Sequence, residues 1–519
     1  MVFLMAFHLL GSPQLLAIVE KEQEKPVQYN ILFAISDDQS YPHASAYGES
    51  LFVTPAFDRV AAKGVLFNNA FVAAPQCSPS RAAILTGRHI WQLEEAGTHG
   101  SYFPRRFPVF TDALISAGYF TGYTGKAWGP GNWVDAGWEN NPVGTAYNSI
   151  KYAEVPATGI SAINYVANFE KFLAEKPDGA PFFFWYGGLE PHRGYEYGSG
   201  IRQGMDPAKI KIPPFLPDHD TVRTDFLDYA LEVAWFDQQL KKMLDLLESM
   251  GELENTIIIV TADNGMAFPN AKASLREYGV HVPLAICGPG IAGNRKVDDL
   301  VSLIDLTPTI LEWAKAEPLP VVSGKSLVSL LGGQEHKVVG QYILTGRERH
   351  THARPDNLGY PARSIRTSDY LYIRNFKPDR WPMGDPPLPD RGIAGFEDID
   401  ESPTKRLLVY NRHRWPTRFQ VATARQGTEE LYAIKEDPGC VVNLAGDNRY
   451  QSILAEHRNK LEQLLIEQGD PRIVGNEIFD SYPRFGIMRP FDGFRERGKY
   501  NNKYQNKPQQ QDEQGDNKK

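Results

Sequence analysis

Residues 30–38 read NILFAISDD, an almost uninterrupted apolar run that ends in two carboxylates. A second run of the same kind, TIIIVTADNG, spans residues 256–265 and closes with an aspartate, an asparagine and a glycine. Short runs that are apolar throughout are typical of strands buried on both faces of a parallel sheet. Ligands and reacting groups gather at the carboxyl ends of such strands. The two runs therefore predict a buried sheet with an acidic site at one edge.

The sequence around these two runs alternates between strand and helix patterns. Apolar runs at residues 181–186 and 282–286 predict two more buried strands. Apolar residues recur at helical spacing over residues 221–250, and a second helix is expected at residues 306–316, with a proline near its first turn. This alternation indicates the α/β fold class, with helices packed around a mostly parallel sheet.

The pattern changes after about residue 340. Strand-like runs become shorter and are broken by proline, arginine and aspartate; they lie at residues 341–344, 370–374 and 407–410. A closing helix is expected at residues 453–467. We therefore expect a large α/β domain over residues 28–338 and a smaller C-terminal α+β domain over residues 339–485.

Composition excludes some classes of protein. The chain has 519 residues, 63 acidic against 55 basic side chains and three cysteines. These values argue against a small disulfide scaffold and against a basic nucleic-acid binder. Residues 1–24 hold an apolar run followed by charges, which predicts a signal peptide or short anchor and hence export. Residues 500–519 are polar and predict a disordered tail.

The acidic strand ends point to a metal ion. Asp37, Asp38, Asp263 and Asn264 would bring three carboxylates and an amide oxygen to one edge of the sheet. Such groups repel one another unless a cation lies among them, and an all-oxygen set selects Ca²⁺ or Mg²⁺ over Zn²⁺. The alternative is that both pairs are ordinary turn residues.

Residues 75–87 read PQCSPSRAAILTG and resemble the signature of type I sulfatases, in which C-x-P-x-R directs oxidation of the cysteine to formylglycine. Other stretches resemble the same family in the same order: Asp37-Asp38, residues 118–126 (GYFTGYTGK), residues 261–265 (TADNG), and residues 430–432 with 443–445. Within the family, the nearest likeness is to the sulfamidase (heparan N-sulfatase) branch and its bacterial polysaccharide-sulfatase relatives. The stretches that carry it are residues 190–193, 263–269 and 303–311.

The resemblance implies a fold and a reaction. The fold would be alkaline-phosphatase-like, with a short antiparallel sheet in the C-terminal domain. Cys77 would be converted to formylglycine (3-oxoalanine) by a formylglycine-generating maturation enzyme. One hydroxyl of the hydrated aldehyde would attack sulfur, and the second would later expel sulfate. The metal ligands implied are Asp37, Asp38, Cys77, Asp263 and Asn264, binding Ca²⁺ or alternatively Mg²⁺.

The same resemblance assigns the other catalytic residues. Arg81 would hold the hydrated aldehyde or a metal carboxylate. Lys126 and Lys272 would bind the sulfate, with Arg276 as an alternative to Lys272. His192 would bind sulfate and donate a proton to the leaving group.

One departure from the family pattern affects proton transfer. Many members carry a histidine within a few residues of the lysine at position 126, whereas here the next residues are Ala127 and Trp128. Either His192 does more, or another histidine such as His99 or His281 reaches the site. Trp128 would stack on a sugar or, alternatively, lie in the core.

A basic stretch suggests how a polyanion is recognised. Residues 346–380 concentrate basic side chains in an otherwise acidic chain: Arg347, Arg349, His350, His352, Arg354, Arg363, Arg366, Arg374 and Arg380. They form either a solvated face or a rim that steers an anionic glycan into the cleft. The substrate-binding candidates are Trp128, Arg193, His350, His352 and Arg374.

The function expected is removal of sulfate from a sulfated oligo- or polysaccharide, either an O-sulfate ester or N-sulfoglucosamine. The alternative enzyme is a formylglycine-dependent phosphodiester or phosphonate monoester hydrolase. A non-catalytic, metal-stabilised glycan-binding protein is the remaining alternative.

Overall fold

The computed structural model of the chain describes residues 28–334, 341–387 and 395–485. The predicted signal peptide at residues 1–24 and the predicted tail at residues 500–519 lie outside the described residues. Within the described part, no helix combines the length and the apolar character that a membrane crossing requires.

A nine-stranded sheet forms the centre of the molecule, in the order β4-β3-β5-β1-β6-β7-β2-β8, with β9 paired to β2. Its strands are β1 (Asn30–Ser36), β2 (Val65–Phe71), β3 (Phe120–Gly125), β4 (Thr145–Ala146), β5 (Phe182–Gly187), β6 (Thr256–Ala262), β7 (His281–Cys287), β8 (Arg295–Val297) and β9 (Val301–Ser302). Strand β7 is antiparallel to both neighbours, and the other pairs are parallel. The predicted mostly parallel α/β sheet is confirmed.

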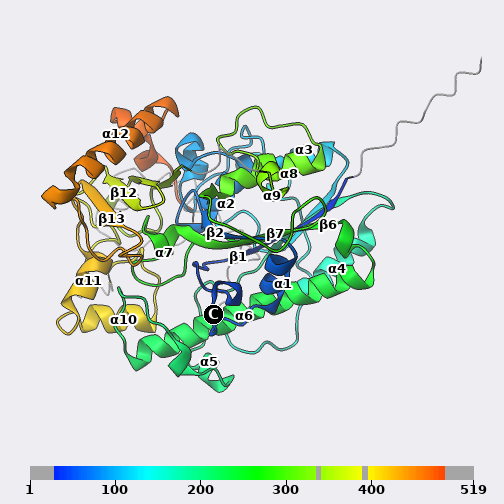
Figure 1. Cartoon of the computed structure of the whole chain (residues 1–519), viewed down its shortest axis with the longest axis horizontal. Helices are drawn as coiled ribbons and strands as arrows, with labels where there is room; N and C mark the ends of the chain where they lie inside the picture. The colour runs from blue at the N-terminus through cyan, green and yellow to red at the C-terminus, as the bar shows by residue number, and fades with distance from the viewer. Residues whose placement is uncertain (1–27, 335–340, 388–394, 486–519) are drawn as a thin grey trace, which may run out of the picture.

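Helices cover both faces of this sheet (Figure 1). The first layer consists of α1 (Pro55–Lys63), α4 (Tyr165–Glu175) and α6 (Asp220–Ser249). The second consists of α2 (Cys77–Thr86), α3 (Phe110–Ser116), α8 (Leu306–Ala314) and α9 (Val328–Leu331). Alternation along β1 serves both layers, because Leu32 packs with the first and Phe33 with the second. The helices predicted at 221–250 and 306–316 correspond to α6 and α8.

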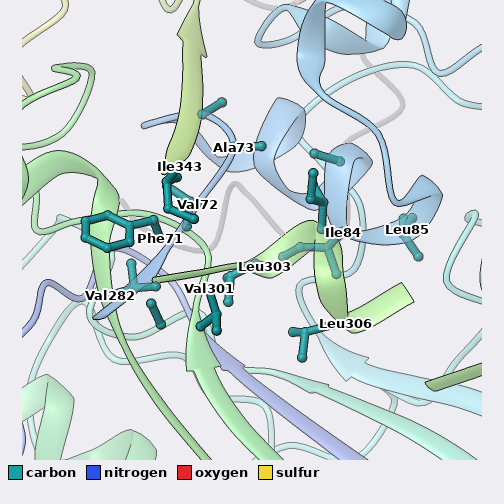
Figure 2. Packing of buried hydrophobic residues seen from close by; sticks show 14 of the residues in the cluster. Phe71, Val72, Ala73, Ile84, Leu85, Val282, Val301, Leu303, Leu306 and Ile343 are labelled. Carbon is teal, nitrogen blue, oxygen red and sulfur yellow. The ribbon is translucent and has the colours of Figure 1, made fainter. Parts of the chain in front are cut away.

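Figure 2 shows part of the core on the second face. Phe71 and Val72 at the end of β2 lie near Ile343, which belongs to a different sheet. Ile84 on α2 faces Leu303 in the turn that precedes α8. Full burial of an aliphatic or aromatic side chain contributes about 1.5–3 kcal/mol. This apolar contact therefore holds α2 rigidly over the sheet.

The second sheet has four antiparallel strands, ordered β10-β11-β12-β13. They are β10 (Ile343–Arg347), β11 (Ala362–Arg366), β12 (Tyr370–Asn375) and β13 (Glu429–Ala433), and α12 (Gln451–Glu467) packs against them. The Gly346 N–H donates to the carbonyl oxygen of Ala73 (3.0 Å), which joins this sheet to the loop before α2. The boundary predicted between residues 338 and 339 falls outside the described residues and stays a prediction.

The strand expected at residues 407–410 is wrong, because these residues end helix α10 (Pro403–Tyr410). Ser402 caps this helix by accepting a hydrogen bond from the Lys405 N–H (3.0 Å), and Pro403 occupies the first turn, where its missing N–H costs nothing. The remaining short helices are α5 (Ser199–Arg202), α7 (Glu277–Val280) and α11 (Pro416–Thr423).

Candidate active site

The acidic strand ends meet as the sequence predicts. Strands β1 and β6 are parallel neighbours with Ser36 opposite Ala262, so Asp37 and Asp263 follow at the same edge. The Asp38 N–H donates to Oδ1 of Asp263 (3.1 Å), and Asp38 holds a left-handed φ of 73°. A non-glycine residue in that conformation stores strain, which is typical of functional sites.

Cys77 lies above these carboxylates as the first residue of α2. Its Sγ is 3.3 Å from Asp37 Oδ1 and 3.9 Å from Asp38 Oδ1. Ligand atoms of Asp37, Asp38, Cys77 and Asp263 all lie within 4.8 Å of one another. Burial, followed by the charge of Asp37, raises the pKa of the Cys77 thiol well above its ordinary value. The thiol therefore stays protonated at neutral pH and is a poor nucleophile as it stands.

Arg81 comes one turn after Cys77 on the same face of α2 and is fully buried. Its Nε donates to Oδ2 of Asp263 (2.7 Å). Its Nη1 donates to the carbonyl oxygens of Lys126 (2.8 Å) and Ala127 (3.1 Å). The guanidinium thus ties α2 to the ends of β6 and β3.

Two lysines reach the carboxylates from opposite sides. Lys126 follows β3, and its Nζ is 2.6 Å from Asp37 Oδ2; the Nζ of Lys272 is 2.6 Å from Asp38 Oδ2. Burial favours the neutral amine, but Asp37 and Asp38 outweigh it and raise the pKa of Lys126 and Lys272, so both stay charged. Gly125, before Lys126, is required because a Cβ there would lie 1.9 Å from the oxygen of Gly187.

The donor set fits a hard divalent cation. Burial raises the pKa of Asp38 and of Asp263, and the neighbouring carboxylates add to the effect. Asn264 donates from Nδ2 to Asp38 Oδ1 (2.7 Å), while its own Oδ1 is buried and accepts no hydrogen bond from the described residues. A cation among these oxygens would satisfy that amide oxygen and relieve the repulsion.

His192 occupies the open side of the site. Its side chain is 36% exposed, and its Nε2 lies 3.9 Å from Asp38 Oδ2. Its Nδ1 is 3.1 Å from the carbonyl oxygen of Arg193, which orients the ring. An imidazole at this position is available to a bound molecule as a proton donor.

Asp400 was not among the sequence candidates. Its Oδ2 lies 3.1 Å from Nζ of Lys272, so Lys272 is held between two carboxylates. Arg276, the alternative to Lys272, pairs instead with Glu430 (2.9 Å). Asp400 lies more than a hundred residues after Lys272, in no motif, and only the contact between the two parts of the chain reveals it.

Of the other histidines, His99 comes toward the site and His281 does not. The rings of His99 and His350 lie 4.7 Å apart, and His99 Nδ1 is 3.1 Å from the His350 carbonyl oxygen. Burial lowers the pKa of both, to about 4 for His350, and the charge of Lys272 contributes in each case. His281 instead stacks on Tyr41 with 4.0 Å between ring centroids.

Two substrate-binding candidates belong to the core. Trp128 is 1% exposed, stacks on Phe103, and donates from Nε1 to the carbonyl oxygen of Ser78 (3.0 Å), so it offers no face to a sugar. Arg193 forms a buried bidentate pair with Asp225 (2.6 and 2.9 Å). Its Nε donates to the Ala267 carbonyl oxygen (2.6 Å), which leaves this guanidinium committed within the protein.

The basic stretch is also not an open rim. Most of its arginines are buried against carboxylates: Arg347 and Arg354 against Asp398, Arg363 against Glu348 and Asp470, and Arg366 against Glu277. Arg374, on β12, pairs with Glu462 of α12, and His352 is 1% exposed. His350 is buried as well, and its Nδ1 lies 3.6 Å from Asp398 Oδ1. The rim interpretation is therefore wrong.

Comparisons with known proteins show what this chain is similar to. The Sulfatase family model matches residues 29–316. Human N-sulphoglucosamine sulphohydrolase is 28% identical over 489 residues, which cover 85% of this chain and 91% of that protein. An ulvan-active sulfatase of Formosa agariphila is 25% identical, covering 86% of this chain and 76% of that protein. A solved structure of a 2-O GAG sulfatase has a TM-score of 0.61 at 21% identity, covering 86% of this chain and 93% of that one.

Proposed function

This chain belongs to the sulfatase family and is a hydrolase of sulfate esters or sulfamates, and we propose that it removes sulfate from sulfated glycans through formylglycine at position 77. One observation carries the proposal. Cys77 begins a helix directly above three buried carboxylates, with Lys126, Lys272 and His192 around it. The protonated thiol is unsuited to attack, whereas a hydrated aldehyde at the same position supplies a nucleophile.

The proposed cofactor is Ca²⁺, with Mg²⁺ as the alternative, held by Asp37, Asp38, Asp263, Asn264 and the modified residue 77. When bound, the ion would lower the pKa of the attacking hydroxyl and neutralise a sulfate oxygen. Three carboxylates are balanced by three basic groups, Arg81, Lys126 and Lys272. With the Asp400 carboxylate beside Lys272 included, a bound dication would leave this set with one net positive charge, which would attract the sulfate group.

The chain's own side chains divide the remaining tasks. A cation that competes for Asp37 and Asp38 would free the ammonium groups of Lys126 and Lys272 to bind the sulfate oxygens. His192, on the exposed side, donates a proton to the departing oxygen or nitrogen. His99 and His350, buried and neutral, line the region near Lys272 in place of the histidine missing after Lys126.

The proposed substrate class is supported by the relatives, and the proposed export of the protein is supported by its N-terminal sequence. The relatives named above act on N-sulphoglucosamine and ulvan, which are sulfated sugars. The apolar run within residues 1–24 supports export, and Cys77 in its C-x-P-x-R segment supports modification by a formylglycine-generating enzyme.

The proposal is tested by sulfate release from a panel containing N-sulfoglucosamine, O-sulfated algal and host oligosaccharides, and an aryl sulfate. Mass spectrometry of the peptide that carries Cys77 should show the mass of the aldehyde. Cys77→Ser should abolish turnover. Release from the aryl sulfate alone would contradict the glycan substrate, and an unchanged rate in Cys77→Ser would contradict the formylglycine mechanism. Parallel assays on sulfate and phosphate esters of one alcohol separate sulfatase from phosphoester hydrolase activity.

A further inference from the structure

One carboxylate at the site comes from the second half of the chain. Asp400 Oδ2 lies 3.1 Å from Lys272 Nζ, and the Asp400 side chain is 22% exposed. The side chains of Asp37, Asp38 and Asp263 are at most 1% exposed. Asp400 is therefore more exposed to solvent than these three carboxylates.

The residues before Asp400 hold it in place. Asp398 pairs with Arg347 (3.0 Å) and Arg354 (2.8 Å), and its Oδ1 accepts from the N–H and the hydroxyl of Thr351 (both 2.9 Å). Ile399 packs in a small apolar cluster with Ala273, the neighbour of Lys272. Contacts with the second sheet and with the loop that carries Lys272 and Ala273 therefore fix the position of the Asp400 backbone.

The charges around Asp400 keep its carboxylate ionised. Burial would raise its pKa, but Lys272, followed by His192, holds it well below the ordinary range, so the group is an anion. An anion repels sulfate oxygens and accepts hydrogen bonds from O–H or N–H donors.

We propose that Asp400 is a specificity-determining residue, whose carboxylate accepts a hydrogen bond from the sugar hydroxyl adjacent to the sulfated position. This inference rests on the proposed function, because it requires a saccharide substrate. It explains how a pocket that attracts any sulfate selects a sugar. A site built to bond a hydroxyl rejects analogues that lack it, since its own polar group is then left unpaired.

The test compares Asp400→Ala and Asp400→Asn with the unchanged enzyme on three substrates. These are the panel sugar with the highest kcat/KM, its analogue lacking the adjacent hydroxyl (for N-sulfoglucosamine, the 3-deoxy sugar), and 4-nitrophenyl sulfate. We expect kcat/KM on the sugar to fall about 10- to 100-fold in Asp400→Ala, the loss typical of a hydrogen bond to a charged group. Turnover of the aryl sulfate should fall by a much smaller factor, because this substrate has no sugar hydroxyl to lose its hydrogen bond. In the unchanged enzyme, kcat/KM on the deoxy sugar should be lower than on the parent sugar by a similar factor. In Asp400→Ala, kcat/KM should be the same on the two sugars.

Two controls separate this role from positioning of Lys272. Lys272→Ala should reduce turnover of both the sugar and the aryl sulfate, and Asp369→Asn, on the exposed surface beside Lys435, should reduce neither. If kcat/KM fell equally on the sugar and on the aryl sulfate in Asp400→Ala and Asp400→Asn, the proposal would be overturned. An unchanged kcat/KM on the sugar would overturn it as well. An unchanged enzyme that cleaves only the aryl sulfate would overturn the proposed glycan substrate itself, and the inference with it.

Discussion

At the scale of single residues, Arg81 shows how one buried cation organises the site. It has no exposed surface, and it bonds Asp263 and two backbone carbonyl groups after β3. Removing one partner of a buried ion pair leaves the other charged and unpaired, which costs about 3–5 kcal/mol. The structural and chemical roles of Arg81 therefore coincide.

We expect Arg81→Ala to lose both stability and turnover. The free energy of unfolding should fall by about 3–5 kcal/mol because Asp263 is left without its guanidinium. Denaturant unfolding and sulfate release measure the two effects. Arg449→Ala, at an exposed position, should change the unfolding free energy by less than about 0.5 kcal/mol. Equal stabilities of the two variants would contradict this role for Arg81.

His43 is a buried residue whose charge state affects stability. Its ring stacks on Phe52 with 4.4 Å between centroids, and its Nδ1 lies 3.0 Å from the Tyr229 hydroxyl. Burial lowers its pKa to about 3, against 6.5 in an unfolded chain. The folded state therefore keeps His43 neutral, and its contribution is complete above pH 6.5 and is lost as the pH falls below that value.

We expect the difference in unfolding free energy between the unchanged protein and His43→Asn to shrink by about 2 kcal/mol between pH 7.5 and pH 5, since each pH unit below 6.5 costs about 1.4 kcal/mol per neutral buried histidine. Comparing the two proteins removes the contribution of other titrating groups. The same difference should stay constant between pH 7.5 and 8.5. A difference independent of pH down to 5 would show that His43 is not held neutral.

At the scale of elements, the strands and the long helices were predictable because their apolar pattern is local. The runs at 30–35, 181–186 and 256–261 became β1, β5 and β6, and the carboxyl ends of β1 and β6 carry the predicted acidic residues. The arginines of residues 346–380 were not predictable in the same way. Their carboxylate partners, such as Glu277, Asp398 and Asp470, lie far away in the sequence. Local charge density therefore suggested an exposed rim where the fold buries ion pairs.

The second sheet offers a matched pair of arginines for testing this distinction. Arg363 on β11 is fully buried and bonds Glu348 and Asp470, whereas Arg374 on β12 is 28% exposed and pairs with Glu462. Arg363→Met should lower the free energy of unfolding by about 3–5 kcal/mol because Asp470 loses its ion-pair partner and Glu348 keeps only Arg472. Arg374→Met should cost at most about 1 kcal/mol, as surface pairs do.

Both variants should keep the KM of the unchanged enzyme, measured on folded protein below its melting temperature. A raised KM for a sulfated oligosaccharide in Arg374→Met would show that this arginine does bind substrate. A small stability loss in Arg363→Met would contradict the structural role of the buried network.

At the scale of the whole molecule, the site is assembled from both parts of the chain. The loops after the strands of the nine-stranded sheet supply the carboxylates and the lysines, helix α2 supplies the cysteine, and the segment between β12 and β13 supplies Asp400. The metal ligands and the cysteine were predictable because they follow strands or open a helix within recognisable motifs. Asp400 was not, because its place depends on packing between Ile399 and Ala273 that no local pattern records.

Because the proposed cation binds groups from β1, β6 and α2 only when they are folded together, it should stabilise the whole chain. Ca²⁺ at 100 times its Kd should stabilise the folded state by about 2.7 kcal/mol, which appears as a rise in melting temperature. Chelation should reverse this rise and abolish sulfate release.

Asn264→Ala removes the amide oxygen that has no partner among the described residues, and should raise the Ca²⁺ concentration needed for half of the thermal shift by about 10-fold or more. Asn68→Ala, on the exposed edge beside Asp298, is the matched control and should leave that concentration unchanged. If chelation altered neither melting temperature nor turnover, the carboxylates would form ion pairs with the lysines and Arg81 only. The proposed reaction would then have to proceed without a metal.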